Sequence, residues 1–384
     1  VAPPIMTTTR LNMRHVFPFS DASRLYRSLG LGCLVSVTLA LIPGISLRTK
    51  AEPLPAIHGP TVRVTSVEEL EQAVQRLTSG VTILIAPGKY PLRRSLVLMN
   101  HLTDIGIRGE SGKVEDVEII GRGMRNKDFG NVPHGIMIGG AENVLLAHFT
   151  LKDFWFHPIS LHGERGCKKV RMHGLRLVDA GEQFLKGNVG KDGHGVDNGI
   201  VEHCIFEFTD TSRGEYTNGL SILGGSNWII RDNLFRNLRA PNGELAGPAV
   251  LMWRGCKNTR CERNTFVNCQ RGIAFGLVDG PPFDHVGGVI QDNTFYRNAE
   301  QPGDAGIMVN NSPGTKVIGN TVILSGTYAA SIEYRFRGTT NCVIENNVCD
   351  MRILRRDGAI AELQGNRVPT AAERDTLRKK FEGM

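Results

Sequence analysis

An asparagine recurs along the second half of the chain at intervals of 27 to 31 residues. In each copy an apolar or small residue stands three positions before the asparagine, and another stands two positions after it. Upstream, a similar spacing continues with an apolar residue in the asparagine position. A period of about 28 residues is the signature of a solenoid, in which each repeat is one unit that stacks on the next. The repeated positions are Phe149, Leu175, Cys204, Asn233, Asn264, Asn293, Asn320 and Asn347.

Between these positions lies a second series of short strand-like segments, such as GLSI at Gly219 and GIMV at Gly306. Two or three short alternating segments per period, separated by Gly, Asn and Pro turns, describe one turn of a coiled parallel sheet. Parallel connections are overwhelmingly right-handed, and residues 81–366 sustain no helical period. The sequence therefore predicts an all-β fold over residues 81–368, a right-handed parallel β-helix of about ten coils.

The recurring asparagines have a structural interpretation in this fold. Stacked coils would place their amides in a column inside the core, where each amide bonds to the next amide and to the bending backbone. A buried amide with all its hydrogen bonds formed is chemically inert. We therefore expect any chemistry on the outer side of the wall.

Two helices are predicted at the ends of the solenoid. Residues 52–80 are expected to hold a linker and an N-terminal capping helix, because Ser66 and Glu69 form a capping-box pattern and Gly80 would stop the helix. Residues 369–384 repeat the pattern as a C-terminal helix. Such helices would cover the strand edges that terminal coils expose. The residues expected to face the core are Leu70, Val74 and Leu77 in the first helix and Leu377 and Phe381 in the second.

The first 51 residues have the layout of a leader. Six Lys or Arg residues against one Asp accompany an apolar run at Leu29–Ile42, and Thr49 to Ala51 suits cleavage. Residues 1–51 are therefore predicted to be a signal peptide, and the protein to be secreted or periplasmic. The alternative is a membrane anchor, because the stretch from Leu29 to Leu47 is just long enough to span a bilayer if it stays uncleaved.

Charge and cysteine content narrow the class of partner. The formal net charge is +7, but six cations against one Asp give the leader +5, so the rest carries about +2. That balance is too small for a nucleic-acid footprint, and we predict no nucleic-acid partner. The seven cysteines beyond the leader include no CxxC pair, so they are expected to be small buried residues. The alternative, in an oxidising compartment, is a disulfide bridge between Cys256 and Cys261 or between Cys342 and Cys349. The protein is expected to be a monomer.

Several stretches carry a family resemblance. VTILIAPGKYPL at Val81, DIGIRGE at Asp104 and the Asn-x-Phe coils resemble the secreted right-handed β-helix proteins of the pectate lyase-like superfamily, over roughly Val62 to Asn366. That superfamily includes polysaccharide lyases, glycoside hydrolases, epimerases and non-enzymatic adhesins. The resemblance implies an extracellular polysaccharide as partner, bound in a groove along one outer face by outward side chains of neighbouring coils.

Uronate cleavage sets the search for catalytic residues. A uronate lyase must neutralise a carboxylate and remove a proton from the adjacent carbon, which requires Arg or a metal ion beside a Lys, Arg, His or Tyr base. Lys186 is expected to be exposed on the outer face, because Leu185 packs inward. LMWRGCKNTRCERNTF at Leu251 faintly resembles the arginine-bearing coil of chondroitinase B-like and alginate lyases, which implies a catalytic or carboxylate-binding Arg254. The coil before it, GLSILGG, lacks the nearby lysine of that family, and Lys186 lies one coil further back.

The predicted site combines this resemblance with the polar residues between Gly181 and Tyr216 and with outward positions of the second strand series. The predicted catalytic residues are Lys186, Arg254 and Glu215. The predicted substrate-binding residues are Glu182, His194, Arg213, Trp253, Glu333 and Arg335. The candidate Ca²⁺ ligands are Asp192 and Asp197, in the turn-rich loop GKDGHGVDNG.

Several of these residues also have a simpler interpretation. The loop GKDGHGVDNG is also typical of a solvated turn, Lys186 and Arg254 could be surface charges, and Glu333 with Arg335 could form an exposed ion pair. The scattered histidines are assigned turn or packing roles; they are His134, His157, His162 and His173. The predicted function is a lyase of acidic polysaccharides. The alternatives are a glycoside hydrolase, in which Asp192, Asp197 and Glu215 would converge, and a non-catalytic carbohydrate-binding or surface protein.

Overall fold

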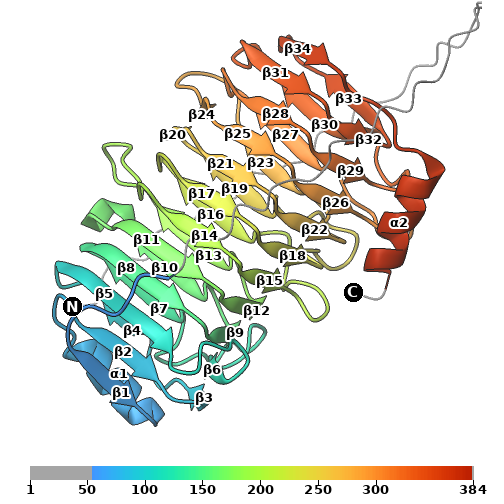
Figure 1. Cartoon of the computed structure of the whole chain (residues 1–384). Helices are drawn as coiled ribbons and strands as arrows, with labels where there is room; N and C mark the ends of the chain where they lie inside the picture. The colour runs from blue at the N-terminus through green and yellow to red at the C-terminus, as the bar shows by residue number, and fades with distance from the viewer. Residues whose placement is uncertain (1–53, 383–384) are drawn as a thin grey trace, which may run out of the picture. The chain divides into compact units, whose positions relative to one another are not determined.

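Three strands make each coil of the protein, and the coils stack in register into three parallel sheets (Figure 1). The computed structural model describes residues 54–382. The predicted leader, with its alternative as an anchor, lies outside these residues. Between residues 54 and 382 there is no helix with the length and apolar character needed to cross a membrane.

Sheet A contains twelve strands, and sheets B and C contain ten each, which gives ten complete coils and confirms the predicted fold. Sheet A consists of β1 (Thr61–Val64), β2 (Thr82–Ile85), β5 (Leu102–Gly109), β8 (Ala141–Ala147), β11 (Lys168–His173), β14 (Ile200–Glu202), β17 (Ile229–Arg231), β21 (Arg260–Glu262), β25 (Val289–Gln291), β28 (Lys316–Ile318), β31 (Cys342–Glu345) and β34 (Ala361–Gln364). Sheet B consists of β3 (Gly88–Pro91), β6 (Val117–Ile120), β9 (Thr150–Phe154), β12 (Arg176–Ala180), β15 (Ile205–Glu207), β18 (Leu234–Arg236), β22 (Thr265–Val267), β26 (Thr294–Tyr296), β29 (Thr321–Ile323) and β32 (Val348–Cys349).

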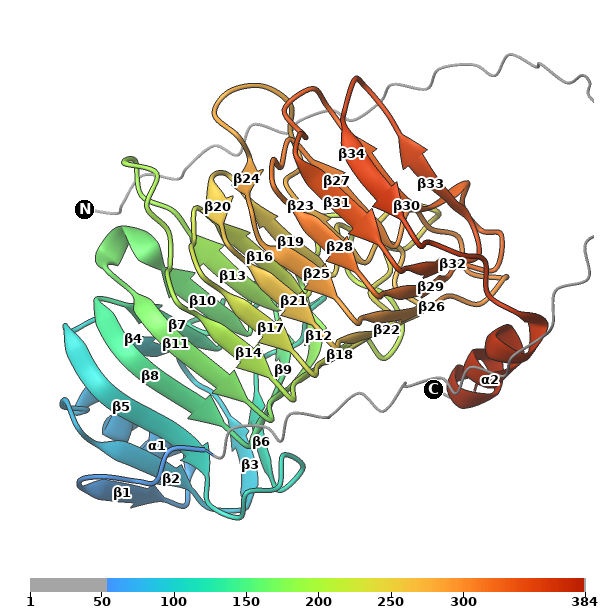
Figure 2. The same ribbon diagram turned by 45° about the horizontal axis from the view of Figure 1, so that its top comes forward.

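Sheet C carries the second strand series of the sequence, and its strands follow those of sheet B in every coil (Figure 2). It consists of β4 (Leu96–Leu98), β7 (Ile136–Gly139), β10 (Ile159–His162), β13 (Leu185–Asn188), β16 (Leu220–Leu223), β19 (Val250–Trp253), β23 (Ile273–Phe275), β27 (Ile307–Asn310), β30 (Ala330–Arg335) and β33 (Arg352–Arg355). A two-stranded sheet of β20 (Cys256–Lys257) and β24 (His285–Val286) and a short 3-10 helix, η1 (Gly163–Arg165), lie in loops between coils.

The asparagine column forms as predicted, at the bend between sheets A and B. The residue before each asparagine adopts a left-handed conformation, as at Asp232 and Arg263, and this bend turns the asparagine inward. Asn264 Nδ2 donates to Asn293 Oδ1 at 3.0 Å and to the carbonyl of Ile230 at 2.9 Å. The same bonds link all members, and the column extends one coil further to Asn366. The amides are therefore satisfied and structural.

The rest of the core is apolar and aromatic. Four phenylalanines two positions after the repeated residue stack with their ring centroids 4.5 to 4.8 Å apart; they are Phe206, Phe235, Phe266 and Phe295. All seven cysteines within the described part of the chain are buried and free, which confirms the small-residue interpretation over the two bridges. Burial raises the pKa of the Cys204 thiol to about 12, so this thiol is unreactive near neutral pH.

The N-terminal helix covers the first coils as predicted, with two differences. α1 (Val67–Gln75) buries Leu70 and Val74 and contacts the first strands of all three sheets (Figure 1). It ends five residues before Gly80, because the N–H of Arg76 already closes the last turn on earlier carbonyls. The Glu69 carboxylate accepts from the N–H of Thr65 at 2.7 Å, so the capping box is offset by one residue. β1 precedes the helix and pairs with β2.

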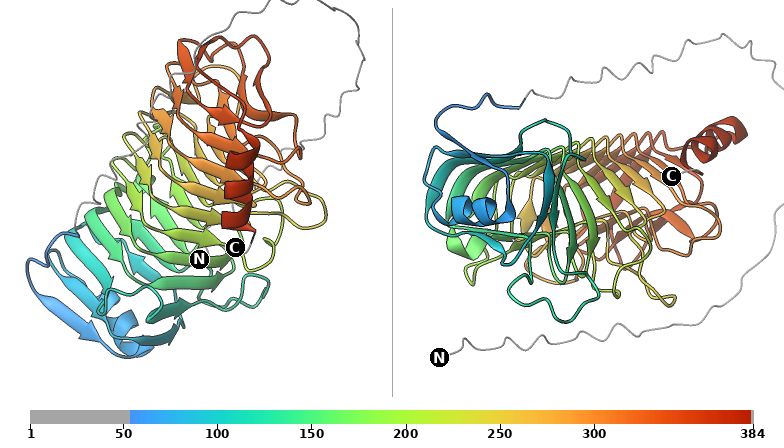
Figure 3. Two further views of the ribbon diagram at one scale, coloured as in Figure 1. Left: turned by 45° about the vertical axis from the view of Figure 1, so that its right-hand side comes forward. Right: turned by 90° about the horizontal axis from the view of Figure 1, so that it is seen from below.

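The C-terminal helix lies elsewhere than predicted. α2 (Ala371–Phe381) has the full capping box of Thr370 and Glu373, but it runs along the outside of sheet B (Figure 3). Phe381 packs on Tyr296, with ring centroids 5.7 Å apart, and belongs to a cluster with Val267 and Ile323. The expectation that this helix caps the last coil is therefore wrong. The helix covers apolar side chains on three neighbouring strands of sheet B, so its apolar face is used there.

Candidate functional site

Lys186 lies on the outer face of sheet C, as its place after the inward Leu185 predicts. Its neighbours in register on the adjacent strands are Ser160 of β10 and Ser221 of β16. Lys186 Nζ donates to Ser221 Oγ at 3.4 Å. The residue is only 9% exposed, so the expectation of an exposed lysine is wrong. The alternation of a strand sets the direction of a side chain, while neighbouring side chains and loops set its exposure.

Burial changes the chemistry of this amine. Desolvation lowers the pKa of Lys186 to about 8, against an opposing effect of Glu182 and with a further lowering by Arg254. A lysine with a pKa near neutrality loses its proton readily and can act as a base. The charges of Glu182 and Arg254 therefore both act on this amine.

Trp253 and Arg254 approach this amine from β19, two strands along the sheet. Trp253 Nε1 donates to Ser221 Oγ at 3.3 Å, so the indole and Lys186 meet at one hydroxyl. The guanidinium of exposed Arg254 lies 5.0 Å from the centroid of the Trp253 ring. The coil between Lys186 and Arg254 therefore carries Ser221 on its outer face. The chondroitinase B-like and alginate lyases that this stretch resembles have a lysine on a nearby coil.

Glu182 lies in the loop before β13 and organises a second group of contacts. Its carboxylate lies 3.6 Å from Arg213 Nη2 and 3.7 Å from His157 Nε2. Desolvation raises its pKa, and Arg213 and Lys186 oppose that rise. Arg213 in turn lies 3.8 Å over the ring of Trp155, and its Nη1 is buried without a hydrogen-bond partner in the described structure. The guanidinium is thus held in place with one donor unused.

Of the two adjacent residues Glu215 and Tyr216, the structure draws the tyrosine into this group. Tyr216 is 59% exposed, yet the pKa of its hydroxyl is raised, first by desolvation of the hydroxyl and then by Glu182. Glu215 is exposed, and its backbone carbonyl accepts from the N–H of Thr217 at 2.8 Å. The catalytic role of Glu215 stays a prediction.

The loop between β13 and β14 holds the candidate Ca²⁺ ligands. Asp192 Oδ1 accepts from the N–H of His194 at 3.1 Å, within one turn. Asp197 Oδ1 accepts from the N–H of Ser226 on the next coil at 2.7 Å. Over residues 54–382 no group of three or more His, Cys, Asp and Glu side chains is placed to hold a metal ion. Ca²⁺ binding by this loop, and substrate binding by the exposed His194, stay predictions.

Glu333 and Arg335 point outward from β30 as predicted, but far from Lys186. Five strand steps separate Glu333 from Lys186, or about 24 Å. Glu333 is buried and accepts from the hydroxyl of Tyr328 at 2.9 Å, and Arg335 Nε donates to Asp357 at 2.7 Å. The alternative of an exposed pair between Glu333 and Arg335 is therefore wrong, because each has another partner.

Three histidines that were assigned turn or packing roles gather beside Lys186. The rings of His134 and His157 stack 5.1 Å apart, and burial lowers the pKa of His134 to about 4. His162 follows on β10, facing outward beside Ser160. The available signal was the alternation in PISLHGE, which places Ser160 and His162 on the same face of one strand. His173 lies apart, on sheet A, where it contacts Glu202.

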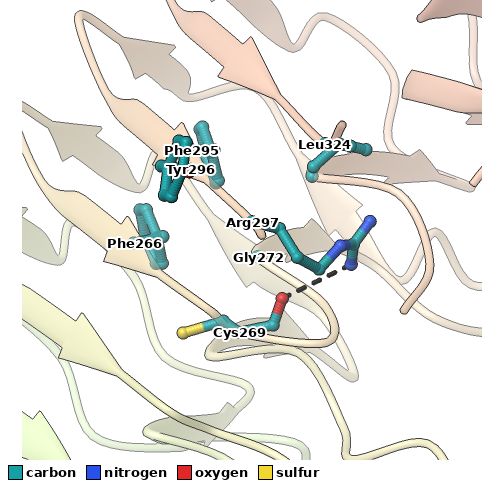
Figure 4. Close-up of a pocket in the computed structure, with 8 residues that line it drawn as sticks. Phe266, Cys269, Gly272, Phe295, Tyr296, Arg297 and Leu324 are labelled. Carbon is teal, nitrogen blue, oxygen red and sulfur yellow. Dashed lines mark hydrogen bonds between the residues drawn. The ribbon is translucent and has the colours of Figure 1, made fainter. Parts of the chain in front are cut away.

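One small cavity lies away from this cluster, at the turn between sheets B and C (Figure 4). Its volume is roughly 10 Å³, about the room of one water molecule. Arg297 lines it and is 1% exposed; its guanidinium donates to the carbonyls of Gln270 and Asp304, both at 2.6 Å. Burial lowers the pKa of Arg297 to about 10. This arginine joins successive coils, and the cavity is too small for a sugar.

Comparison with known proteins supports the β-helix fold. The family model described as "Right handed beta helix region" matches residues 218–368. The structure is similar to the PL6 family polysaccharide lyase of Pseudopedobacter saltans, at 12% identity and a TM-score of 0.51, over 81% of this chain and 93% of that one. The chain has the fold of a right-handed parallel β-helix.

Two further solved structures share this β-helix. The catalytic domain of a GH87 alpha-1,3-glucanase is 12% identical, with a TM-score of 0.53 over 83% of this chain and 60% of that one. The GH136 lacto-N-biosidase of Eubacterium ramulus is 11% identical, with a TM-score of 0.50 over 81% and 68%. No curated protein matches this β-helix in sequence. At these identities the likeness concerns the fold, and the activity must be argued from the residues.

Proposed function

We propose that the protein is a secreted lyase that cleaves an acidic polysaccharide by β-elimination on the outer face of sheet C. The observation that carries the proposal is the buried amine of Lys186, with a pKa of about 8, within electrostatic reach of Arg254 and Glu182. Among the described carboxylates, Glu182 is the one whose charge acts on this amine. A hydrolase needs two carboxylates about 5 to 9 Å apart, so a single carboxylate among cations favours elimination.

Each group has a role in that reaction. Neutral Lys186 takes the proton from the carbon beside the uronate carboxylate, and the resulting negative charge is stabilised on that carboxylate by the guanidinium of Arg254. As the carbon–oxygen bond to the next sugar breaks and a carbon–carbon double bond forms, the leaving oxygen takes a proton from Tyr216. The unused donor of Arg213 is available to a substrate oxygen, and the Trp253 indole offers an apolar face to a sugar ring.

The test is incubation of the purified protein with a panel of uronate polysaccharides, with and without Ca²⁺, while ultraviolet absorbance reports unsaturated ends. We expect absorbance with at least one substrate, and its loss in Lys186→Met and Arg254→Met. Lys191→Met is the matched control, since Lys191 is an exposed lysine of the loop after β13 and should leave the rate unchanged.

The outcomes separate the competing functions. New reducing ends without absorbance would replace the lyase by a glycoside hydrolase. Retained binding of a polysaccharide without any product would make the protein a carbohydrate-binding protein. Absorbance that survives Lys186→Met would leave a lyase but remove Lys186 as its base.

A further inference from the structure

Three side chains at alternating positions of one segment form a hydrogen-bonded chain beside Lys186. Ser160 Oγ lies 3.2 Å from His162 Nε2, and His162 Nδ1 lies 2.7 Å from Glu164 Oε1. Ser160 and His162 belong to β10, and Glu164 belongs to η1, which follows directly. A hydroxyl, an imidazole and a carboxylate in this order have the connectivity of a serine hydrolase triad, which is recognised by geometry and roles rather than by sequence position.

The local backbone explains why these residues meet. In a strand, side chains two positions apart share one face, so Ser160 and His162 both leave the outer face of sheet C. Gly163 then starts the tight turn of η1, which brings Glu164 back to the ring. A Cβ on Gly163 would lie 2.7 Å from the carbonyl oxygen of Asn188 and still closer to Gly195, so only glycine fits where this turn passes the next coil.

The hydrogen bonds assign the proton positions. A carboxylate only accepts, so the Glu164 contact places a proton on His162 Nδ1. In the neutral ring Nε2 is then free to accept the proton of Ser160 Oγ. Partial burial acts to raise the pKa of Glu164, but the hydrogen bond from His162, the backbone N–H of Glu164 and the charges of His162 and Arg165 together lower it. The carboxylate therefore stays ionised, as an orienting group must.

The surroundings supply the remaining requirements of acyl transfer. Ser160 is 2% exposed and lies on the floor of the face, whereas the His162 side chain is 15% exposed and reachable. Lys186 is the register neighbour of Ser160 on the next strand. In its protonated form it puts a cation beside the hydroxyl, where negative charge develops on an attacked carbonyl oxygen.

We propose that Ser160, His162 and Glu164 form an esterase triad that removes ester-linked acyl groups, such as O-acetyl, from a polysaccharide bound on sheet C. This activity is separate from elimination and does not depend on it. The proposed elimination gives no role to the Ser160 hydroxyl, which is hydrogen-bonded to the His162 imidazole that Glu164 orients.

The steps balance with water as the co-reactant. Ser160 Oγ bonds to the acyl carbon as its proton passes to His162 Nε2, and the carbonyl oxygen takes the negative charge. The ester carbon–oxygen bond then breaks, and His162 returns the proton to the leaving sugar hydroxyl. Water attacks the acyl-serine in the same way, which releases the carboxylic acid and restores the Ser160 hydroxyl.

The experiment measures acetate released from an O-acetylated polysaccharide, and covalent labelling by a fluorophosphonate probe, using the full chain. Wild-type protein should release acetate and carry one adduct on the peptide that contains Ser160. Ser160→Ala and His162→Ala should each lower kcat/KM for acetate release by about 10³-fold or more, and Glu164→Gln by about 10²-fold or more. Circular dichroism checks that each variant is folded.

Ser331→Ala is the matched control, because Ser331 is a buried serine of β30 in sheet C, away from Lys186. It should keep acetate release and probe labelling. A probe adduct on the peptide that contains Ser221, instead of the peptide that contains Ser160, would overturn the triad in favour of a Ser221 and Lys186 pair. Absence of both acetate release and labelling in the wild type would also overturn the proposal. A de-esterified uronate polysaccharide assayed in parallel tests elimination alone, so either activity can fail without the other.

Discussion

Replacing Asn293 with alanine tests how much the asparagine column contributes to stability. Asn293 Oδ1 accepts from the N–H and the Nδ2 of Asn264 at 2.9 and 3.0 Å, and Asn293 Nδ2 donates to Cys261 and to Asn320, both at 2.9 Å. Alanine removes all four bonds and leaves two donors of Asn264 without an acceptor, at a residue 1% exposed. A buried unsatisfied donor costs about 1 to 3 kcal/mol, so Asn293→Ala should lower the free energy of unfolding by about 2 to 6 kcal/mol.

The column contains its own control. Asn366 ends it and accepts from the same two groups of Asn347, at 3.0 and 2.9 Å, but it lies in the last coil and is partly exposed. Water can replace its carbonyl, so Asn366→Ala should cost about 1 kcal/mol or less. Urea unfolding followed by circular dichroism measures both. Equal losses from the two variants would refute the reasoning, because position in the column would then not matter.

Three further outcomes follow from the structure. Lys186 must be neutral to accept a proton, so kcat/KM for elimination should rise with pH through a midpoint near 8. Glu182→Gln should move that midpoint to lower pH, because the charge of Glu182 raises the pKa of Lys186. An unmoved midpoint would contradict the electrostatic interaction between Glu182 and Lys186. Phe381→Ala should loosen α2 while the coils stay folded, seen as faster tryptic cleavage near Lys379 at an unchanged unfolding midpoint; simultaneous loss of the coils would mean that the helix supports them. Burial raises the pKa of the described thiols, as for Cys261 and Cys349, so peptide mapping with a thiol reagent should find them unlabelled in the native protein and labelled in urea, and native labelling would argue against this burial.

The sequence predicts the coil well because the coil repeats. Each turn buries an apolar residue, an asparagine and another apolar residue at fixed spacing, so the inner face leaves a periodic record in the chain. The helices at the two ends of the solenoid leave a weaker record in the sequence. Leu377 and Phe381 show that one side of the last helix is buried, but not that its partners are Val267 and Tyr296 of sheet B rather than the last coil. An amphipathic pattern shows that a helix face is buried, but it does not identify the residues against which that face packs.

The site is predicted only in part for a related reason. Strand alternation gives the outward direction of Lys186, whereas its burial and its lowered pKa arise from loops and from residues of other coils, such as Glu182 and Arg254. The same limit explains Glu333, whose partners Tyr328 and Arg356 come from a loop and from the segment after the next strand. Contacts between residues of different coils depend on the conformations of the loops. Loop conformations do not repeat from coil to coil, so the periodic sequence pattern does not predict them.

The outer face is informative where it fails to repeat. Along one outward column of sheet C the residues change from Ser160, Lys186 and Ser221 to apolar side chains of neighbouring coils; these are Leu251, Ala274 and Met308. The backbone at all six positions is the same parallel strand in register, so the fold does not require a lysine between two serines at this place. Desolvating that lysine costs stability, and the neighbouring apolar residues show that the position accepts a side chain without this cost. A buried cation at a position that tolerates apolar residues is therefore best explained by a role in catalysis. The same reasoning applies to Ser160 and His162 beside it, for the proposed cleavage of esters.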